Sequence, residues 1–145
     1  MTYSTFNPPI EELQKACLGS LPEEVIEGLR LFNAGKYFEA HEHLETAWRN
    51  EPGLIRELYR GILQAGIAYY HIERGNFDGA TKLFASCLNW LNPYPDQCRG
   101  IQVGKLKQDV RIVQLSLQRL GREHISGFDA RMFKPVNFHI EDSNE

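Results

Sequence analysis

The chain has 145 residues, a formal net charge of −3 at pH 7, and 42% hydrophobic and 24% charged residues. This length is typical of a single domain. The charge argues against a nucleic-acid-binding protein, which needs a basic stripe to meet the phosphates. The longest apolar stretch, residues 61–70, contains Gln64 and is too short to cross a bilayer, so no membrane span is predicted.

Three cysteines, Cys17, Cys87 and Cys98, are an odd number at irregular spacing, with no C-x-x-C pair. The sequence therefore predicts no disulfide framework, and this cysteine usage fits a reducing, intracellular compartment. The first residues, MTYSTFNPPIEE, lack the basic and apolar segments of a signal peptide. Together these features predict a cytoplasmic protein. Cys87 falls on the apolar face of a helix and is predicted to belong to the core.

Apolar residues recur at helical spacing along most of the chain, and no segment reads convincingly as a strand. The run Leu21-Pro22-Glu23-Glu24 suits a first helical turn, because proline and acids are favoured there. Pro52-Gly53 and Asn92-Pro93 interrupt the helical pattern. We predict helices over about residues 9–18, 22–34, 36–50, 53–73, 77–91 and 97–120.

Residues 122–145 have scattered aromatic side chains and no helical period. We expect this tail to wrap the helices and then to fray at its end. The tail side chains expected to contact the helices are Phe128, Met132, Phe133 and Phe138.

Two segments resemble each other at an offset of 40 residues, GKYFEAHEHLETAWRNEP (35–52) and GNFDGATKLFASCLNWLNP (75–93). Each follows a helix that ends at a glycine, so each unit is predicted to be an antiparallel αα-hairpin. The order of glycine, aromatic, alanine, large apolar and small residues is similar to that of a tetratricopeptide repeat. Two units are too few for a solenoid, so we predict an all-α fold, a compact bundle of five to six helices that contains two hairpins.

The segment HEHLE, residues 41–45, comes close to the zinc-protease motif H-E-x-x-H. At 100° per residue His41 falls in the apolar stripe of its helix, whereas Glu39 and His43 point away from it. The helix over residues 53–73 is apolar nearly all round and keeps one narrow polar stripe. A short turn joins the two helices, so we predict that they pack antiparallel and that their polar sides meet. The resulting polar seam is formed by His41, Glu42, Glu45, Arg60, Gln64 and His71.

Two interpretations of this seam stay open. In the structural one, Arg60 donates to a carboxylate and the histidines are held by carboxylates or carbonyls, because a buried unpaired charge costs several kcal/mol. In the functional one, Arg60, Gln64 and His71 hold a small polar or anionic ligand, or else His41, Glu45 and His71 hold a metal ion. No metal is predicted, since Arg60 would repel a cation and the sequence lacks the pair of E-x-x-H helices of a di-iron bundle.

The runs FNAGKYFEAHEHLETAWRNEPG and YRGILQAGIAYYHIERGNFDGATKLF resemble the domain of unknown function 309 family over about residues 28–91. The motifs E-A-H-E-x-L-E-x-x-W and G-N-x-x-G-A carry the resemblance, which implies a small all-helical bundle and no particular activity. Outside the seam, Asn76 and Gly79 are interpreted as a helix cap and a close helix contact. The family's motif residues in this sequence are Glu39, His41, Glu42, Glu45, Trp48, Arg60, Gln64, His71, Asn76 and Gly79.

We expect a non-catalytic intracellular module that binds a partner protein or a small polar ligand, because helical hairpins more often present surfaces than catalyse reactions. No cofactor, nucleic acid or membrane partner is expected. The alternative is a metal-assisted hydrolase that uses His41, Glu45 and His71 as ligands and Glu42 as general base. A third alternative is a homodimer that forms through the basic helix over residues 97–120 and the aromatic tail.

Overall fold

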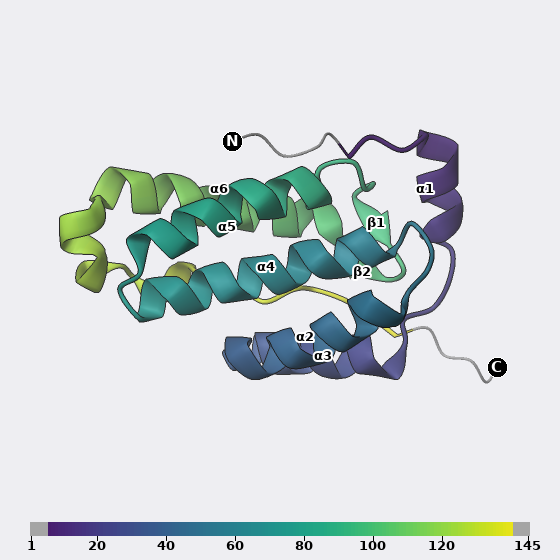
Figure 1. Ribbon diagram of the computed structural model, residues 1–145, viewed down its shortest axis with the longest axis horizontal. Helices are drawn as coiled ribbons and strands as arrows, with labels where there is room; N and C mark the ends of the chain where they lie inside the picture. The colour runs from purple at the N-terminus through teal and green to yellow at the C-terminus, as the bar shows by residue number, and fades with distance from the viewer. Residues whose placement is uncertain (1–5, 141–145) are drawn as a thin grey trace.

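Six α-helices account for most of residues 6–140, the part of the chain that the computed structural model describes. They are α1 (Ile10–Ala16), α2 (Glu23–Asn33), α3 (Tyr37–Asn50), α4 (Arg56–Glu73), α5 (Phe77–Leu91) and α6 (Val103–Leu120). From α2 onward each helix contacts the next one in the chain, and α4 lies between α3 and α5 (Figure 1). The predicted all-α bundle is confirmed.

Two glycines with positive φ turn the chain back between the helices of each hairpin. Gly35 has φ +80° and Gly75 has φ +75°, a conformation that glycine adopts without steric cost. At each turn the glycine N–H donates to the carbonyl three residues earlier, and the following N–H donates to the carbonyl five residues earlier. This pattern is typical of a Schellman-type helix end, and it folds α2–α3 and α4–α5 into hairpins.

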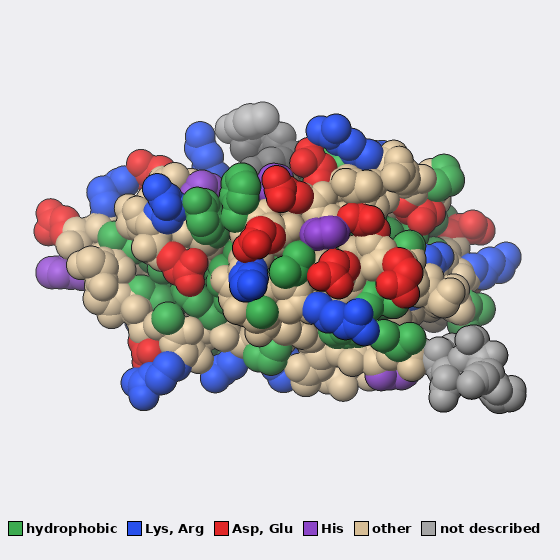
Figure 2. All heavy atoms as spheres, turned by 90° about the horizontal axis from the view of Figure 1, so that it is seen from below, with side chains coloured by type: hydrophobic (Ala, Val, Ile, Leu, Met, Phe, Trp, Pro, Cys, Tyr) green, Lys and Arg blue, Asp and Glu red, His purple; other side chains and the backbone are tan. Residues whose placement is uncertain are grey.

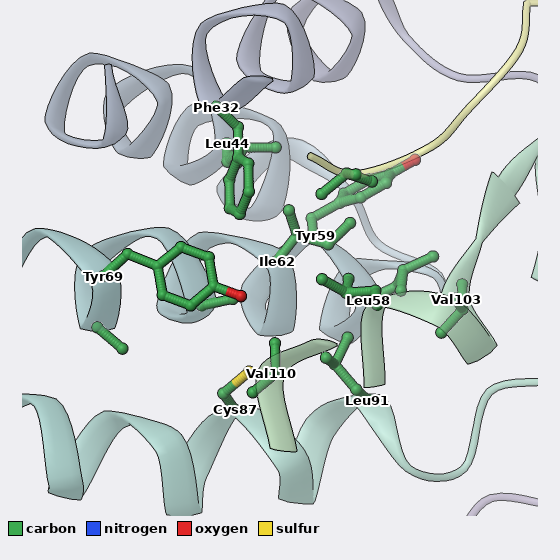
Figure 3. Packing of buried hydrophobic residues seen from close by; sticks show 14 of the residues in the cluster. Phe32, Leu44, Leu58, Tyr59, Ile62, Tyr69, Cys87, Leu91, Val103 and Val110 are labelled. Atoms are coloured by element: carbon green, nitrogen blue, oxygen red, sulfur yellow. The ribbon is translucent and has the colours of Figure 1, made fainter. Parts of the chain in front are cut away.

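The core is built around α4, which is apolar nearly all round as its sequence predicts. Tyr59, Ile62 and Tyr69 are fully buried, and Figure 3 shows α4 packed between Phe32 on one side and Cys87 on the other. Cys87 is therefore a core residue as predicted, and burial raises the pKa of its thiol. Within residues 6–140 none of the helices, α4 included, has the length and apolar character that crossing a membrane requires.

Residues 97–102 correct the prediction of a continuous helix over 97–120 and of a chain without strands. Strands β1 (Gln97–Cys98) and β2 (Ile101–Gln102) pair antiparallel, and α6 begins only at Val103. The two loop residues, Arg99 and Gly100, both have positive φ, as a type I′ hairpin turn requires. Cys98 and Ile101 have the spacing of a helix face, but they are buried together as a cross-strand pair.

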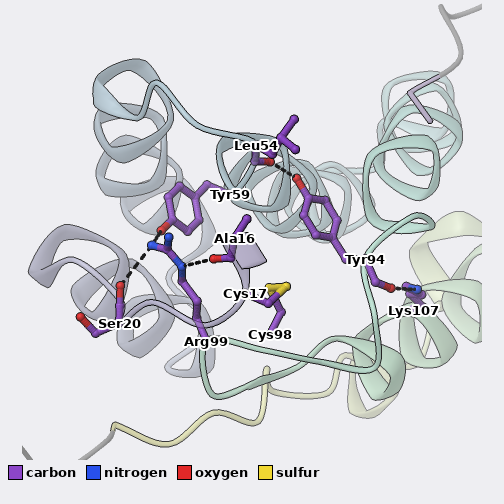
Figure 4. The surroundings of a disulfide bond; sticks show 9 residues. All are labelled: Ala16, Cys17, Ser20, Leu54, Tyr59, Tyr94, Cys98, Arg99 and Lys107. Carbon is purple, nitrogen blue, oxygen red and sulfur yellow. Dashed lines mark hydrogen bonds between the residues drawn. A yellow bond between two sulfur atoms is a disulfide. The ribbon is translucent and has the colours of Figure 1, made fainter. Parts of the chain in front are cut away.

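Cys17 and Cys98 form a disulfide, which corrects the prediction that the cysteines are unpaired (Figure 4). Their Cα atoms lie 4.5 Å apart although 81 residues separate them in the chain. Proximity of this kind arises from the tertiary fold and leaves no local pattern in the sequence. Because these two cysteines are paired, cysteine usage no longer supports the prediction of a reducing compartment.

The tail crosses the back of α4 and returns towards the β-hairpin (Figure 1). It contains two short 3-10 helices, η1 (Arg122–Gly127) and η2 (Ala130–Met132), and Phe138 then forms a bridge to Ile101. The Asn33 side chain fixes the extended part, since it accepts from the Val136 N–H at 2.7 Å and donates to its carbonyl at 2.9 Å. The four tail residues predicted to contact the helices do so, Phe128, Met132, Phe133 and Phe138. The expected fraying of the last residues, 141–145, lies outside the described part.

Candidate functional site

Two of the three α3 side chains of the seam lie at the border of the buried face of that helix. Tyr37, Ala40, Leu44 and Ala47 are buried against α2 and α4, which fixes how α3 is rotated. His41 and Glu45 flank this face, with 27% and 35% of their side-chain surfaces exposed. The rotation thus leaves their polar ends at the boundary between the core and solvent.

A pocket of about 330 Å³ lies between α3 and α4, and we call it the α3–α4 pocket. Four of the six predicted seam residues line it, whereas Glu42 and His71 do not. Its lining residues are His41, Glu45 and Trp48 from α3 and Arg60, Leu63 and Gln64 from α4. The two helices therefore meet through their polar sides over part of the predicted seam.

Glu45 is held on its own helix rather than by the facing one. Its carboxylate accepts from Arg49 Nη2 at 2.9 Å and lies 3.5 Å from His41 Nε2, both at i,i+4 spacing. The predicted partner on α4, Arg60, instead pairs with Glu57, with 2.9 Å between Nε and Oε1. The charged side chains on each side of the pocket are therefore paired within their own helix.

The Arg60 guanidinium lies between two tryptophan rings. Its central carbon is 4.7 Å from the ring centroid of Trp48 and 4.1 Å from that of Trp90, and Arg56 lies on the Trp48 ring at 4.7 Å. Cations on aromatic faces are stabilised by the ring quadrupole. This Arg–Trp stack ties α3, α4 and α5 together. Sequence reasoning missed the parts played by Trp90 and Glu57, although Glu57 and Arg60 stand at a recognisable i,i+3 spacing.

Four polar atoms of the pocket residues are buried and have no hydrogen-bond partner among residues 6–140. One is Nε of Arg60, which still lies in the ion pair with Glu57. The three that remain unpaired are Nδ1 of His41, Nε1 of Trp48 and Oε1 of Gln64. By contrast, the indole N–H of Trp90 donates to Ser86 Oγ at 3.1 Å. Leaving a buried donor or acceptor unpaired costs about 1–3 kcal/mol, so this clustering at one pocket favours a ligand that pairs with them.

His71 lies at the end of α4, where it contacts the cap of α5 rather than the pocket. The Asn76 side chain accepts from the Gly79 N–H at 2.9 Å, and its Nδ2 lies 3.3 Å from His71 Nδ1. A Cβ on Gly79 would stand 2.6 Å from Asn76 Nδ2 and 3.0 Å from His71 Cδ2, so glycine allows this close approach. Burial lowers the pKa of His71. Asn76 and Gly79 thus act as cap and close contact, as their sequence context predicts.

Glu39 and Glu42 project from the exposed side of α3, away from the pocket. His43 lies between them in the chain and contacts Glu24 of α2, with 2.5 Å between Nδ1 and Oε2. Figure 2 views the molecule from the α2–α3 side and shows acidic side chains gathered on this face. Glu42 is therefore exposed on α3 and does not line the pocket.

A metal centre would need at least three donor side chains close together. Within residues 6–140 no group of three His, Cys, Asp or Glu side chains is placed to hold one ion. His41 and Glu45 lie together, but His71 contacts Asn76 instead. The three side chains named as metal ligands in the hydrolase alternative are therefore not assembled as a site.

Two uncharacterized proteins match about half of the chain. Over 79 residues it is 33% identical to an uncharacterized protein of Aquifex aeolicus (strain VF5), covering 52% of this chain and 23% of that protein. Over 72 residues it is 39% identical to the uncharacterized protein YpuF of Bacillus subtilis (strain 168), covering 48% of this chain and 41% of that protein. The matches thus span less than half the length of either relative.

A family model also matches, over a segment that holds every residue predicted for the site. The family is described as Domain of unknown function (DUF309), and the match covers residues 25–83. This range agrees with the resemblance seen over about residues 28–91. Residues 25–83, which contain α2, α3, α4 and the first part of α5, are therefore similar to the DUF309 family.

Proposed function

We propose that this chain is a non-catalytic module that binds a small polar ligand in the α3–α4 pocket. The observation that carries the proposal is the set of unpaired buried atoms at the pocket, from His41, Trp48 and Gln64. A ligand that pairs with them recovers hydrogen bonds that folding leaves unmade. Hydrogen bonding of this kind needs no metal and no activated nucleophile.

The donors and acceptors favour a neutral amide group. The Trp48 indole nitrogen can only donate, and Gln64 Oε1 can only accept. A carboxamide offers one acceptor oxygen and N–H donors, so it complements both atoms at once. The charges of the pocket are already matched, because Arg60 pairs with Glu57 and Glu45 pairs with Arg49. A neutral ligand leaves both pairs intact, whereas a charged one would compete with them.

The three unpaired atoms are shielded from solvent. A ligand therefore reaches them only after side chains at the pocket wall rotate. Rotamer changes of this size are common on binding, while the backbone moves little. The helices that carry the pocket are fixed by the Arg–Trp stack, so we expect binding to change side chains and to leave the bundle as it is.

The two tryptophan indole N–H groups provide the test. In ¹⁵N-labelled protein, acetamide, acetate and methylammonium are added separately as neutral, anionic and cationic probes, and the indole signals are followed by NMR. We expect acetamide to shift the Trp48 signal in a saturable way. The Trp90 signal is the internal reference, because its N–H is already bonded to Ser86.

Two variants control the assignment of the site. Gln64→Leu removes the acceptor and should abolish the acetamide response, whereas Gln114→Leu changes a half-buried glutamine of α6 and should not. Absence of any Trp48 response to the three probes would overturn the proposal, and so would an equal response in Gln64→Leu. The search would then turn to a partner protein, the other ligand class expected from the sequence.

A further inference from the structure

The disulfide fastens the segment that precedes α2 to the β-hairpin (Figure 4). Besides this bond, the segment is held by Arg99, whose backbone N–H donates to the Cys17 carbonyl at 2.9 Å. The Arg99 side chain donates to the carbonyls of Ala16 at 2.8 Å and Ser20 at 3.1 Å. The one buried side chain of α1 is Leu13. Of the other hydrophobic side chains of α1 only Ala16 packs against the core, so few contacts would hold α1 if the disulfide opened.

The two cysteines of this disulfide differ in exposure. Cys98 is 1% exposed, while Cys17 is half-buried. Cys17 also lines a cavity of about 300 Å³, together with Ser20, Arg99 and His139. In thiol–disulfide exchange the attacked sulfur is the one that the incoming thiolate can reach, so attack is directed to Cys17.

We propose that Cys17–Cys98 is a thiol-exchange site that takes a small thiol from this cavity. The thiolate of the reagent bonds to Cys17 Sγ, the sulfur–sulfur bond breaks, and Cys98 leaves as a thiolate that takes up a proton. A second thiolate then attacks the mixed disulfide, which frees Cys17 and yields the disulfide of the reagent. Two thiols are thereby oxidised while the protein disulfide is reduced by two electrons.

Exchange at this site releases the only disulfide cross-link within residues 6–140, which joins the end of α1 to the β-hairpin. The hold on α1 then rests on Leu13, on the partly buried Ala16 and on the three hydrogen bonds from Arg99. Just before α1, Phe6 also packs against Trp90 and Tyr94. A short segment held by so few contacts opens locally without unfolding the rest of the molecule. The redox state of one disulfide thus controls whether α1 stays docked, and this holds whether or not the α3–α4 pocket binds a ligand.

The site of attack is tested on the oxidised 145-residue chain. The protein is incubated with reduced glutathione under native conditions, quenched with acid, digested and mapped by mass spectrometry. We expect glutathione on Cys17, a free thiol at Cys98 and no adduct on Cys87, which is fully buried. An adduct that forms first on Cys98, or no adduct at all, would overturn the proposal.

A second measurement separates native exchange from exchange that needs global unfolding. Ser20→Trp narrows the cavity and keeps the backbone carbonyl that Arg99 uses, so it should slow exchange several-fold without changing the urea midpoint. Ser126→Trp, at an exposed serine of η1 at the opposite end of the bundle (Figure 1), is the matched control and should exchange at the wild-type rate. Equal rates in all three chains would contradict the proposal.

Amide hydrogen exchange reads out the consequence for α1. After reaction with glutathione, residues 10–16 should lose protection while α3, α4 and α5 keep theirs. Unchanged protection of α1 in the reacted protein would show that the bond does not control its docking.

Discussion

The α2–α3 and α4–α5 hairpins turn through the same backbone hydrogen bonds around Gly35 and Gly75, yet different side chains surround the two turns. At the first turn Lys36 precedes α3 and makes no side-chain cap. At the second, Asn76 caps α5 and contacts His71. The backbone conformation of the turn therefore requires only the glycine. The Asn76 side-chain cap is present at the second turn and has no counterpart at the first.

The two hairpins also differ in how closely their helices approach. A Cβ on Gly61 of α4 would stand 2.5 Å from Leu91 of α5, and one on Gly28 of α2 would stand 2.8 Å from Leu44 of α3. The central hairpin is buried on more sides than the outer one, so its side chains have less space to move when a residue is enlarged. Two hairpins can thus share the same turn and still differ in how strongly a substitution destabilises them.

The largest effect is expected from filling the close contact in the central hairpin. Gly61→Val should lower the free energy of unfolding by ~3 kcal/mol, because Leu91 is fully buried and cannot move aside. Gly28→Val should cost less, ~2 kcal/mol, since its contact is less tight. Urea unfolding curves measure both values. The reverse order would show that the outer hairpin is the more rigid one.

Replacing either turn glycine with alanine should lower the free energy of unfolding by almost the same amount. Gly35→Ala and Gly75→Ala each place a Cβ on a residue with positive φ, at a cost of about 1–2 kcal/mol. Beyond the adjoining backbone, no other part of residues 6–140 comes within 4 Å of either new Cβ, so the cost is confined to the local backbone. Gly127→Ala, which also has open space but no positive φ, is the control and should change stability little. Unequal losses at the two turns would mean that their surroundings matter more than the glycine.

Removing the side chain that precedes the second helix should destabilise the α4–α5 hairpin and not the α2–α3 hairpin. Asn76→Ala should reduce stability by ~1 kcal/mol, because the Gly79 N–H loses its acceptor. Lys36→Ala, at the corresponding position, removes no cap and should have almost no effect. Asn76→Asp should restore most of the loss, since aspartate also caps helices. A comparable loss in Lys36→Ala, measured by thermal unfolding, would refute the difference between the turns.

The smallest effect is a dependence on pH near His71. Burial lowers its pKa in the folded state, and Nδ1 faces the Asn76 amide nitrogen, which can only donate. The unfolded state, with a pKa near the ordinary 6.5, therefore binds the proton more tightly. The free energy of unfolding should fall as the pH drops below about 6.5.

His71→Gln should reduce this acid-dependent loss. Glu73, whose pKa burial raises, is present in both chains and cancels in the comparison. His124→Gln, at an exposed histidine of η1, is the control and should follow the wild type. Unfolding measured at several pH values between about 5 and 7 would contradict the prediction if the wild type and His71→Gln lost stability in parallel.

Helix periodicity was sufficient to predict the bundle, the central position of α4 and the burial of Cys87. It also placed His41 and Glu45 beside Gln64, because the register of two helices joined by a short turn is nearly determined by their apolar faces. The partner of Arg60 could not be derived in this way. A helical wheel gives the face of a long side chain but not its rotamer, and Glu57 and Trp90 both lie within its reach.

The β-hairpin and the disulfide were missed for a different reason. Arg99-Gly100 is not among the dipeptides that most strongly favour a two-residue turn, and the strands beside it are too short to show alternation. The pairing of Cys17 with Cys98 depends on how α1 docks, which no local pattern records. The hairpin thus has only a weak local signal, whereas the disulfide depends on a contact between distant segments.

The disulfide also has a mechanical consequence. A force applied to the two ends of the oxidised chain passes directly from Cys17 to Cys98, so the 80 residues between them, 18–97, carry none of the tension. That sheltered loop contains α2, α3, α4 and α5. Once the bond is reduced, the same pull reaches these helices, and their complete unravelling would lengthen the chain by roughly 280 Å, at ~3.5 Å per residue over a separation of 81.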